Sequence, residues 1–166
     1  DHDSGVRTPF FVTMPGTVQA GKVSDELVDF ADLLPTFCDL AKIDLSADKN
    51  LDGVSLLPSL IGKGERDKPW SYLFYSRNDG SRQASSVVVR NATHLVFRKG
   101  GPTKEIQSFN CSTPFERKLH EIKNQSEEDR KVYAELTKVM TDYDARFQSE
   151  LSEETVAKWQ KKRRKK

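Results

Sequence analysis

The first residues of the chain carry side chains that could ligate a metal ion or contact an anion. The chain opens with Asp1, His2 and Asp3, and Arg7 follows a turn at Gly5. Neighbouring residues of an extended chain point to opposite faces, so Asp1, His2 and Asp3 make a poor closed metal site. We interpret them as a polar run. Arg7 could pair with a carboxylate or contact an anion directly, and both interpretations stay open.

The other histidines and the two cysteines show no catalytic spacing. His94 falls on a predicted strand and His120 in a polar stretch, and neither has a partner at catalytic spacing. Cys38 lies among apolar residues, which predicts a small buried side chain, although a disulfide to Cys111 stays open. The sequence contains no glycine-rich phosphate loop, no paired zinc-binding cysteines and no Gly-x-Ser-x-Gly motif. It therefore offers no self-contained catalytic constellation.

Three Asn-x-Ser/Thr sequons are present, at Asn91, Asn110 and Asn124. The pattern is short, and it is used only in a secretory pathway. The sequons alone are therefore weak evidence of glycosylation.

The first part of the chain is expected to hold one strand and two helices. Residues 10–14 are apolar and are closed by a Pro-Gly pair, which predicts a strand covered on both faces. Apolar residues recur at helical spacing over residues 32–41, which predicts a helix capped by Asp32 or a neighbour. A shorter helix, capped by Ser55, is expected within residues 51–61.

The second part of the chain predicts a small antiparallel sheet and a long helix. Short strand patterns separated by tight turns are typical of a meander; they cover residues 70–75, 85–89, 94–97 and 105–109. A helix is expected over residues 127–147, with Ser126 and Asp129 near a capping box. Its apolar residues form one stripe, which should pack on the sheet; the stripe is Val132, Leu136, Val139, Tyr143 and Phe147.

These elements suggest a division of the chain into four segments. Residues 1–62 hold the first strand and helices, and residues 63–69 are a polar linker rich in Gly and charge. Residues 70–147 hold the sheet and the long helix. Residues 148–166 are a polar, basic tail.

The charge of the chain is concentrated at its end. Residues 161–166 are all Lys or Arg, and without them the chain has 21 basic and 25 acidic residues. A nucleic-acid partner for the whole chain is therefore disfavoured.

With 31% charged and 36% hydrophobic residues, the composition is not that of a disordered chain. No apolar run approaches the roughly 18 residues of a membrane helix, so no membrane span is predicted.

Several short motifs occur in a definite order along the chain. Ser-Gly-Val-Arg-Thr-Pro (4–9) precedes the first strand and Met-Pro-Gly (14–16), and Val-Ser-Asp (23–25) precedes Asp-Leu-Leu-Pro-Thr (32–36). Leu-Asp-Gly-Val-Ser-Leu follows at 51–56. Motifs of this kind in this order resemble the sulfatase family, closely over residues 4–62 and loosely over residues 70–147.

The sequence departs from the sulfatase pattern at three places. Asp3-Ser4-Gly5 stands where the family has an acidic residue and two glycines. Lys42 stands where the family has a glycine after the helix, so that helix is expected to end without a left-handed glycine cap. The sequence 107–109, Gln-Ser-Phe, replaces a Tyr-Asp-Leu strand. The register of the second part is therefore left open.

The resemblance implies a fold and a catalytic site. Sulfatases have an alkaline-phosphatase-like α/β core followed by a smaller antiparallel sheet and helix. This chain would then be the end of the core plus that smaller unit, α/β in class and α+β as a fragment. The family uses a formylglycine made from Cys or Ser in a Cys/Ser-x-Pro-x-Arg motif. A calcium ion is held by carboxylates and an Asn, and Lys and His residues assist.

The residues for this chemistry are missing from the chain. Cys111 is followed by Pro114 and Arg117, which are three and six positions later instead of two and four. We interpret this segment as a chance similarity. By the resemblance, His2, Asp3 and Arg7 lie near the rim of the substrate cleft, and no catalytic residue or metal ligand lies in this chain.

The leading hypothesis is therefore the C-terminal part of a sulfatase. Its formylglycine and calcium site would lie outside this chain, which alone should be inactive. The partners would be a sulfated small molecule or glycan and the N-terminal part of the enzyme. Two alternatives stay open: a phosphodiesterase or phosphonate hydrolase of the same superfamily, and a non-catalytic module whose basic tail binds an anionic partner.

Overall fold

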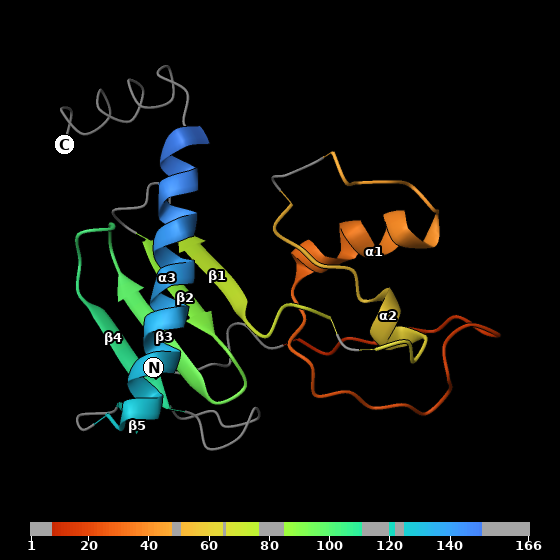
Figure 1. Cartoon of the computed structure of the whole chain (residues 1–166), viewed down its shortest axis with the longest axis horizontal. Coiled ribbons are helices and arrows are strands. Elements are labelled where there is room, and N and C mark those ends of the chain that lie inside the picture. Colours follow the sequence, from red (N-terminus) through yellow and green to blue (C-terminus); the bar gives the residue numbers. More distant parts are fainter. Residues whose placement is uncertain are drawn as a thin grey trace.

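The computed structural model describes residues 8–47, 51–64, 66–76, 85–110, 120–121 and 125–150. A 3-10 helix and two short helices come first, then a five-stranded sheet and a long helix (Figure 1). The elements are η2 (Phe30–Asp32), α1 (Leu33–Leu40), α2 (Leu57–Leu60), β1 (Ser71–Ser76), β2 (Ser85–Arg90), β3 (His94–Lys99), β4 (Ile106–Asn110), β5 (His120–Glu121) and α3 (Glu127–Glu150).

The sheet is an antiparallel meander with the strand order β1-β2-β3-β4-β5. The predicted four-strand meander is confirmed, and each observed strand lies within two residues of its predicted bounds. Leu73 pairs with Val88, and Val88 pairs with Phe97 on the next strand. The two-residue β5 was not predicted, because a strand of this length leaves no alternating pattern to detect.

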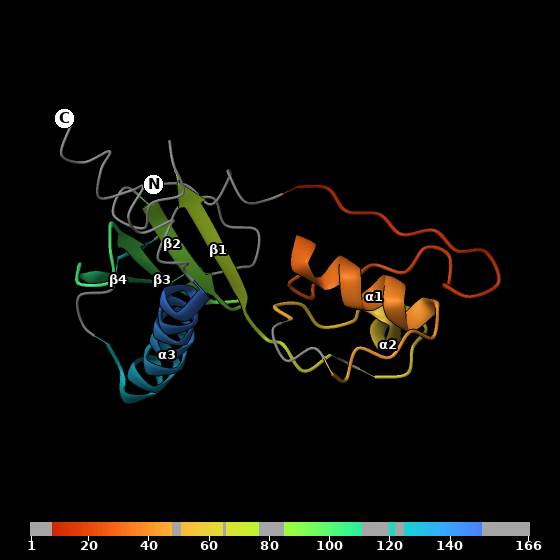
Figure 2. The ribbon, with the colours of Figure 1, turned by 90° about the horizontal axis from the view of Figure 1, so that it is seen from above.

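Helix α3 packs across one face of the sheet, as both views show (Figures 1 and 2). The helix buries Tyr133, Leu136 and Met140 against Val87, Val89 and Val96. Leu136 belongs to the predicted stripe, and two more of its residues, Val132 and Val139, pack partly buried against the same cluster. The predicted packing of the stripe on the sheet is confirmed, and the residues beside it, Tyr133 and Met140, are among the most deeply buried. Burial of such side chains removes apolar surface from water, which stabilises the pair of layers by roughly 25 cal/mol per Å².

The start of α3 carries the expected capping box. The N–H of Ser126 donates to Asp129 Oδ2 at 2.9 Å, and the N–H of Asp129 donates to Ser126 Oγ at 3.1 Å. Each residue thus satisfies a backbone donor that the first helical turn leaves without a partner.

Helix α1 confirms the helix predicted over residues 32–41, and Asp32 stands at its N-cap position. The carboxylate of Asp32 makes no cap bond to α1; it accepts from the N–H of Asp29 in the capping box of η2, of which Asp29 is the N-cap. At the other end Lys42 has φ 58°, and the N–H of Ile43 donates to the carbonyl of Cys38 at 2.8 Å. Helix α1 therefore ends without a glycine cap, as expected, but Lys42 itself adopts the left-handed conformation that usually falls to glycine.

The strand predicted over residues 10–14 does not form in the structure. A strand needs a neighbour for its backbone hydrogen bonds, and nothing in the described part of the chain pairs with this segment. Phe11 is 90% exposed. The apolar pattern is therefore present without the strands that it would join.

Two smaller expectations for the first part are also corrected. Leu56, not Ser55, is the N-cap of α2. Ser55, one residue earlier, still accepts a hydrogen bond through its Oγ from the N–H of Leu57, the first residue of α2, at 3.2 Å. The same hydroxyl donates to Asp39 Oδ2 at 2.7 Å. Cys38 is a free thiol and is half-buried, because the face of α1 on which it lies is only partly covered.

Candidate functional site

The three residues predicted at the rim of a substrate cleft, His2, Asp3 and Arg7, lie outside the described residues. The segment Cys111 to Arg117 lies outside them as well. The site residues that the sequence singled out therefore stay predictions, and the structure instead brings a different polar cluster together.

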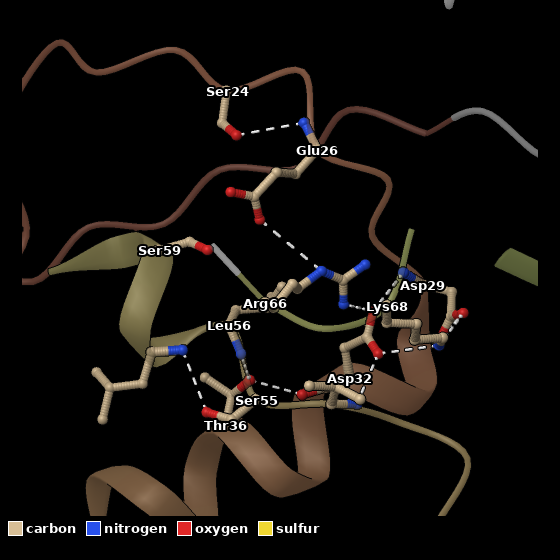
Figure 3. A network of polar contacts seen from close by, with 12 residues as sticks. Ser24, Glu26, Asp29, Asp32, Thr36, Ser55, Leu56, Ser59, Arg66 and Lys68 are labelled. Atoms are coloured by element: carbon tan, nitrogen blue, oxygen red, sulfur yellow. Dashed lines mark hydrogen bonds and ion pairs between the residues drawn. The ribbon is translucent and has the colours of Figure 1, made fainter. Parts of the chain in front are cut away.

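The centre of this cluster is the carboxylate of Asp32, which is fully buried (Figure 3). The backbone N–H of Asp29 donates to Oδ2 at 2.9 Å, and that of Val54 donates to Oδ1 at 3.0 Å. Lys68 Nζ donates to Oδ1 at 3.1 Å, and Arg66 Nη1 lies 2.6 Å from Oδ2. Four contacts from three stretches of the chain thus converge on one side chain.

The surroundings of Asp32 favour its charged form. Burial alone would raise the pKa of Asp32, but the backbone hydrogen bonds from Asp29 and Val54 and the ammonium of Lys68 together hold it below its ordinary value. The carboxylate is therefore ionised at neutral pH, and it offsets the buried charges that face it.

Arg66 and Lys68 come from the polar linker, and the side chain of each is only 2% exposed. Lys68 also pairs with Asp29 Oδ2 at 2.7 Å and lies over the ring of Trp70. Arg66 Nη1 and Nη2 make no hydrogen bond of good geometry within the described residues, so its contact with Asp32 is an ion pair only. The linker is thus held to the start of α1 by buried charge.

The same cluster joins two of the sequence motifs. Thr36 Oγ1 donates to the carbonyl of Asp32 at 2.6 Å and accepts from the N–H of Leu56 at 2.9 Å. A Cβ added to Gly53 would lie 1.9 Å from the carbonyl oxygen of Ala31, so only glycine fits there. The Asp-Leu-Leu-Pro-Thr helix and the Leu-Asp-Gly-Val-Ser-Leu turn therefore form one structural unit.

A second contact connects this unit to the end of α3. Arg146 Nη2 pairs with Asp52 Oδ1, and the guanidinium lies 4.8 Å from the centre of the Tyr143 ring. Tyr143 stacks on Tyr72 with ring centroids 4.1 Å apart. Burial, and then the negative charge of Asp52, raise the pKa of the Tyr143 phenol, which therefore stays neutral over the physiological range.

A buried ion pair fixes the same helix to the middle of the sheet. Arg98 on β3 donates to Asp144 on α3 through both terminal nitrogens, at 2.5 and 2.9 Å. A bidentate pair of this kind sets the position of the helix along the strand.

His94 has a carboxylate partner that the sequence spacing did not reveal. Its Nε2 lies 2.9 Å from Asp129 Oδ1, and its Nδ1 lies 2.8 Å from the hydroxyl of Thr93. The ring also meets Tyr133 edge to face. The sequence showed no partner of His94 at catalytic spacing, and this one lies 35 residues away. The contact ties β3 to the first turn of α3.

A comparison with protein families identifies the chain. The family described as N-sulphoglucosamine sulphohydrolase, C-terminal, matches residues 1–154. The chain belongs to this sulfatase family. It represents a C-terminal portion, as the order of motifs indicated.

Individual sulfatases match shorter stretches. Human N-acetylgalactosamine-6-sulfatase is 38% identical over 77 residues, which are 46% of this chain and 14% of that protein. An extracellular sulfatase SULF-1 homolog of Drosophila melanogaster is 34% identical over 96 residues, 57% of this chain and 8% of that protein. Human steryl-sulfatase is 36% identical over 76 residues, which are 46% of this chain and 13% of that protein. The chain thus spans well under a fifth of these relatives, and no solved structure matches it.

The described part of this sulfatase portion does not fit the calcium ion that the family implies. Among those residues no group of three or more His, Cys, Asp or Glu side chains could hold a metal ion. The acidic side chains around Asp32 already face Arg66 and Lys68. We therefore assign the Asp32 cluster a structural role.

No helix within the described ranges is long and apolar enough to cross a membrane.

Proposed function

We propose that this chain completes a sulfatase that hydrolyses sulfate esters at a formylglycine and calcium site outside the chain. The match to a sulfatase C-terminal family over residues 1–154 carries this proposal. A sulfate ester is anionic, so its hydrolysis needs fixed positive charge or a divalent cation beside the reacting oxygens. The Asp32 cluster cannot supply that charge, because its cations are engaged by buried carboxylates.

The role of this chain in the enzyme is to pack against the N-terminal part. Many large apolar side chains are exposed along residues 8–47, which is unusual for the surface of a protein that has no partner there. They are Phe10, Phe11, Val12, Met14, Val23, Val28, Phe30, Leu34, Phe37 and Ile43. By contrast, the sheet and α3 expose only Phe74 and Tyr75 among the described residues. The first segment, 1–62, is therefore proposed to be the end of the catalytic core, and residues 70–147 a unit with its own core.

The substrate is proposed only as a class, a sulfated small molecule or glycan. The names of the relatives refer to an N-acetylgalactosamine sulfate in one protein and to a steryl sulfate in another. No described residue of this chain distinguishes between them.

The test is an assay of the parent polypeptide that contains this chain, produced in cells able to form formylglycine. We expect calcium-dependent hydrolysis of an aryl sulfate, and little hydrolysis of an aryl phosphodiester. The 166-residue chain alone should be inactive with both. Preferential hydrolysis of the phosphodiester would favour the phosphodiesterase alternative, and sulfatase activity of the isolated chain would contradict a site outside it.

A further inference from the structure

The three sequons occupy different places in the fold. Asn91 lies in the turn between β2 and β3, and Asn110 is the last residue of β4. Asn124 lies outside the described residues. A glycan is bulky and hydrophilic, so the folded protein can carry it only where the Asn side chain opens to solvent.

At Asn91 the two ends of the side-chain amide have separate roles. Oδ1 accepts hydrogen bonds from the N–H groups of Thr93 and His94, at 3.0 and 2.7 Å. Nδ2, the atom that bears an N-linked glycan, has no hydrogen-bond partner among the described residues. Asn91 itself is half-buried, and the two residues after it, Ala92 and Thr93, are exposed. The turn therefore fixes the amide through its oxygen and leaves the nitrogen available.

At Asn110 the surroundings are different. Asn110 pairs with His94 on one side and with His120 on the other. Directly paired residues of an antiparallel sheet point to the same face, and His94 points toward α3, where it contacts Asp129. Next to Asn110, the carbonyl of Phe109 accepts a hydrogen bond from Tyr133 of the same helix. A glycan on Asn110 would therefore start on the face of the sheet that α3 covers.

We propose that Asn91 is an N-glycosylation site and that Asn110 is not. Attachment forms a bond from Nδ2 to the anomeric carbon of an oligosaccharide carried on a lipid pyrophosphate. The bond from that carbon to the pyrophosphate oxygen breaks, and the lipid pyrophosphate leaves as the amide nitrogen loses one proton. The donor and its transferase belong to the secretory pathway and are not part of this chain.

The proposal also orients this chain within the whole enzyme. A glycan at residue 91 keeps the β2–β3 turn and the neighbouring start of α3 in solvent. The surface that packs against the N-terminal part must then lie elsewhere, which agrees with the exposed apolar residues of the first segment.

The test is expression of the full chain behind a secretory signal in eukaryotic cells. Glycans are removed by peptide N-glycosidase in heavy-oxygen water, and each formerly glycosylated Asn is mapped by mass spectrometry as labelled Asp. Secreted and cell-retained protein are both mapped. The matched variants are Thr93→Ala, which keeps Asn91 but destroys its sequon, Thr93→Ser, which keeps the sequon, and Asn110→Gln.

We expect label at Asn91 in the parent chain, in Thr93→Ser and in Asn110→Gln, and none at Asn91 in Thr93→Ala. Label at Asn110 in secreted protein would contradict the argument from α3. An unlabelled Asn91, whether or not another sequon is labelled, would overturn the proposal.

Discussion

Lys42 shows how a single residue can be placed against its own preference. It ends α1 with φ 58°, a conformation that costs a non-glycine residue roughly 1 kcal/mol or more. The hydrogen bond from Ile43 to Cys38 closes the helix end regardless. The position is therefore held by the backbone pattern around it rather than by the Lys side chain.

We expect Lys42→Gly to stabilise the chain by about 1 kcal/mol, because glycine adopts positive φ without strain. Lys42→Ala removes the same charge but keeps a Cβ, so it should give no such gain. Urea unfolding followed by circular dichroism measures both. An equal gain in the two variants would show that the charge, not the backbone, is responsible.

Gly53 is constrained by space rather than by φ. Adding one methyl group would place it against the backbone of Ala31, and backbone atoms cannot move aside as a flexible side chain can. We expect Gly53→Ala to destabilise the first segment by about 3 kcal/mol. At Gly62, where a Cβ meets nothing within 4 Å but φ is 72°, the same change should cost only about 1 kcal/mol. Similar unfolding midpoints for the two variants would contradict the close approach of the turn to η2.

At the scale of the element, α3 is held at its first turn and over its last two turns. Asp129 fixes its first turn to His94. In the last two turns, Asp144 pairs with Arg98 and Arg146 pairs with Asp52. These contacts select one position of the helix on the sheet, whereas apolar packing alone would tolerate small slips.

The contact at the first turn should make stability depend on pH. The side-chain hydrogen bond with His94, and then those from Ser126, lower the pKa of Asp129 to about 2. A carboxyl with a lowered pKa stabilises the fold above its unfolded pKa, and this contribution is lost as the pH falls from about 4 to about 2. We expect Asp129→Asn to have a lower melting temperature than the parent chain at pH 7, with the difference closing over that interval.

The exposed Glu128 in the same turn provides the control. Glu128→Gln should leave the melting temperature nearly unchanged at every pH. A constant gap between Asp129→Asn and the parent chain down to pH 2 would show that the ionised carboxylate is not what matters.

Sequence patterns predicted the strands and the helix of residues 70–147 but not the long-range polar contacts that hold the fold together. The strands and α3 follow from alternation and helical spacing, which are local properties. The partners of Asp32 lie 22 and 36 residues away in Val54 and Lys68, and Asp52 lies 94 residues from Arg146. No local rule links such residues. The linker sequence offers one signal: arginine and lysine side chains are seldom buried without partners, so a buried Arg66 or Lys68 implies a partner elsewhere in the chain.

In the first segment, residues 1–62, the sequence motifs were more informative than the predicted elements. Its motifs identified the family, yet the strand predicted over residues 10–14 is missing, because a strand is defined by neighbours as much as by its own residues. The site residues His2, Asp3 and Arg7 lie outside the described residues and stay predictions.

At the scale of the whole molecule, the exposed apolar side chains of residues 8–47 should make the isolated chain self-associate. We expect Phe11→Lys to reduce self-association without lowering the melting temperature, since Phe11 is 90% exposed. Tyr75→Lys, at a position 62% exposed on the sheet, should leave self-association unchanged. Sedimentation velocity measures both. A monomeric parent chain that Phe11→Lys destabilises would mean that the segment is covered within the chain itself.

The place of α3 at the end of the described chain matters during synthesis. The sheet strands β1 to β4 leave the ribosome before α3 exists, so Val87, Val89 and Val96 have no cover at first. About 50 residues separate the end of β3 from the end of α3, and at roughly 5–20 residues per second they take about 3–10 s to make. For that interval the nascent sheet presents its apolar face to the cell, which makes it a natural substrate for chaperones that bind the growing chain.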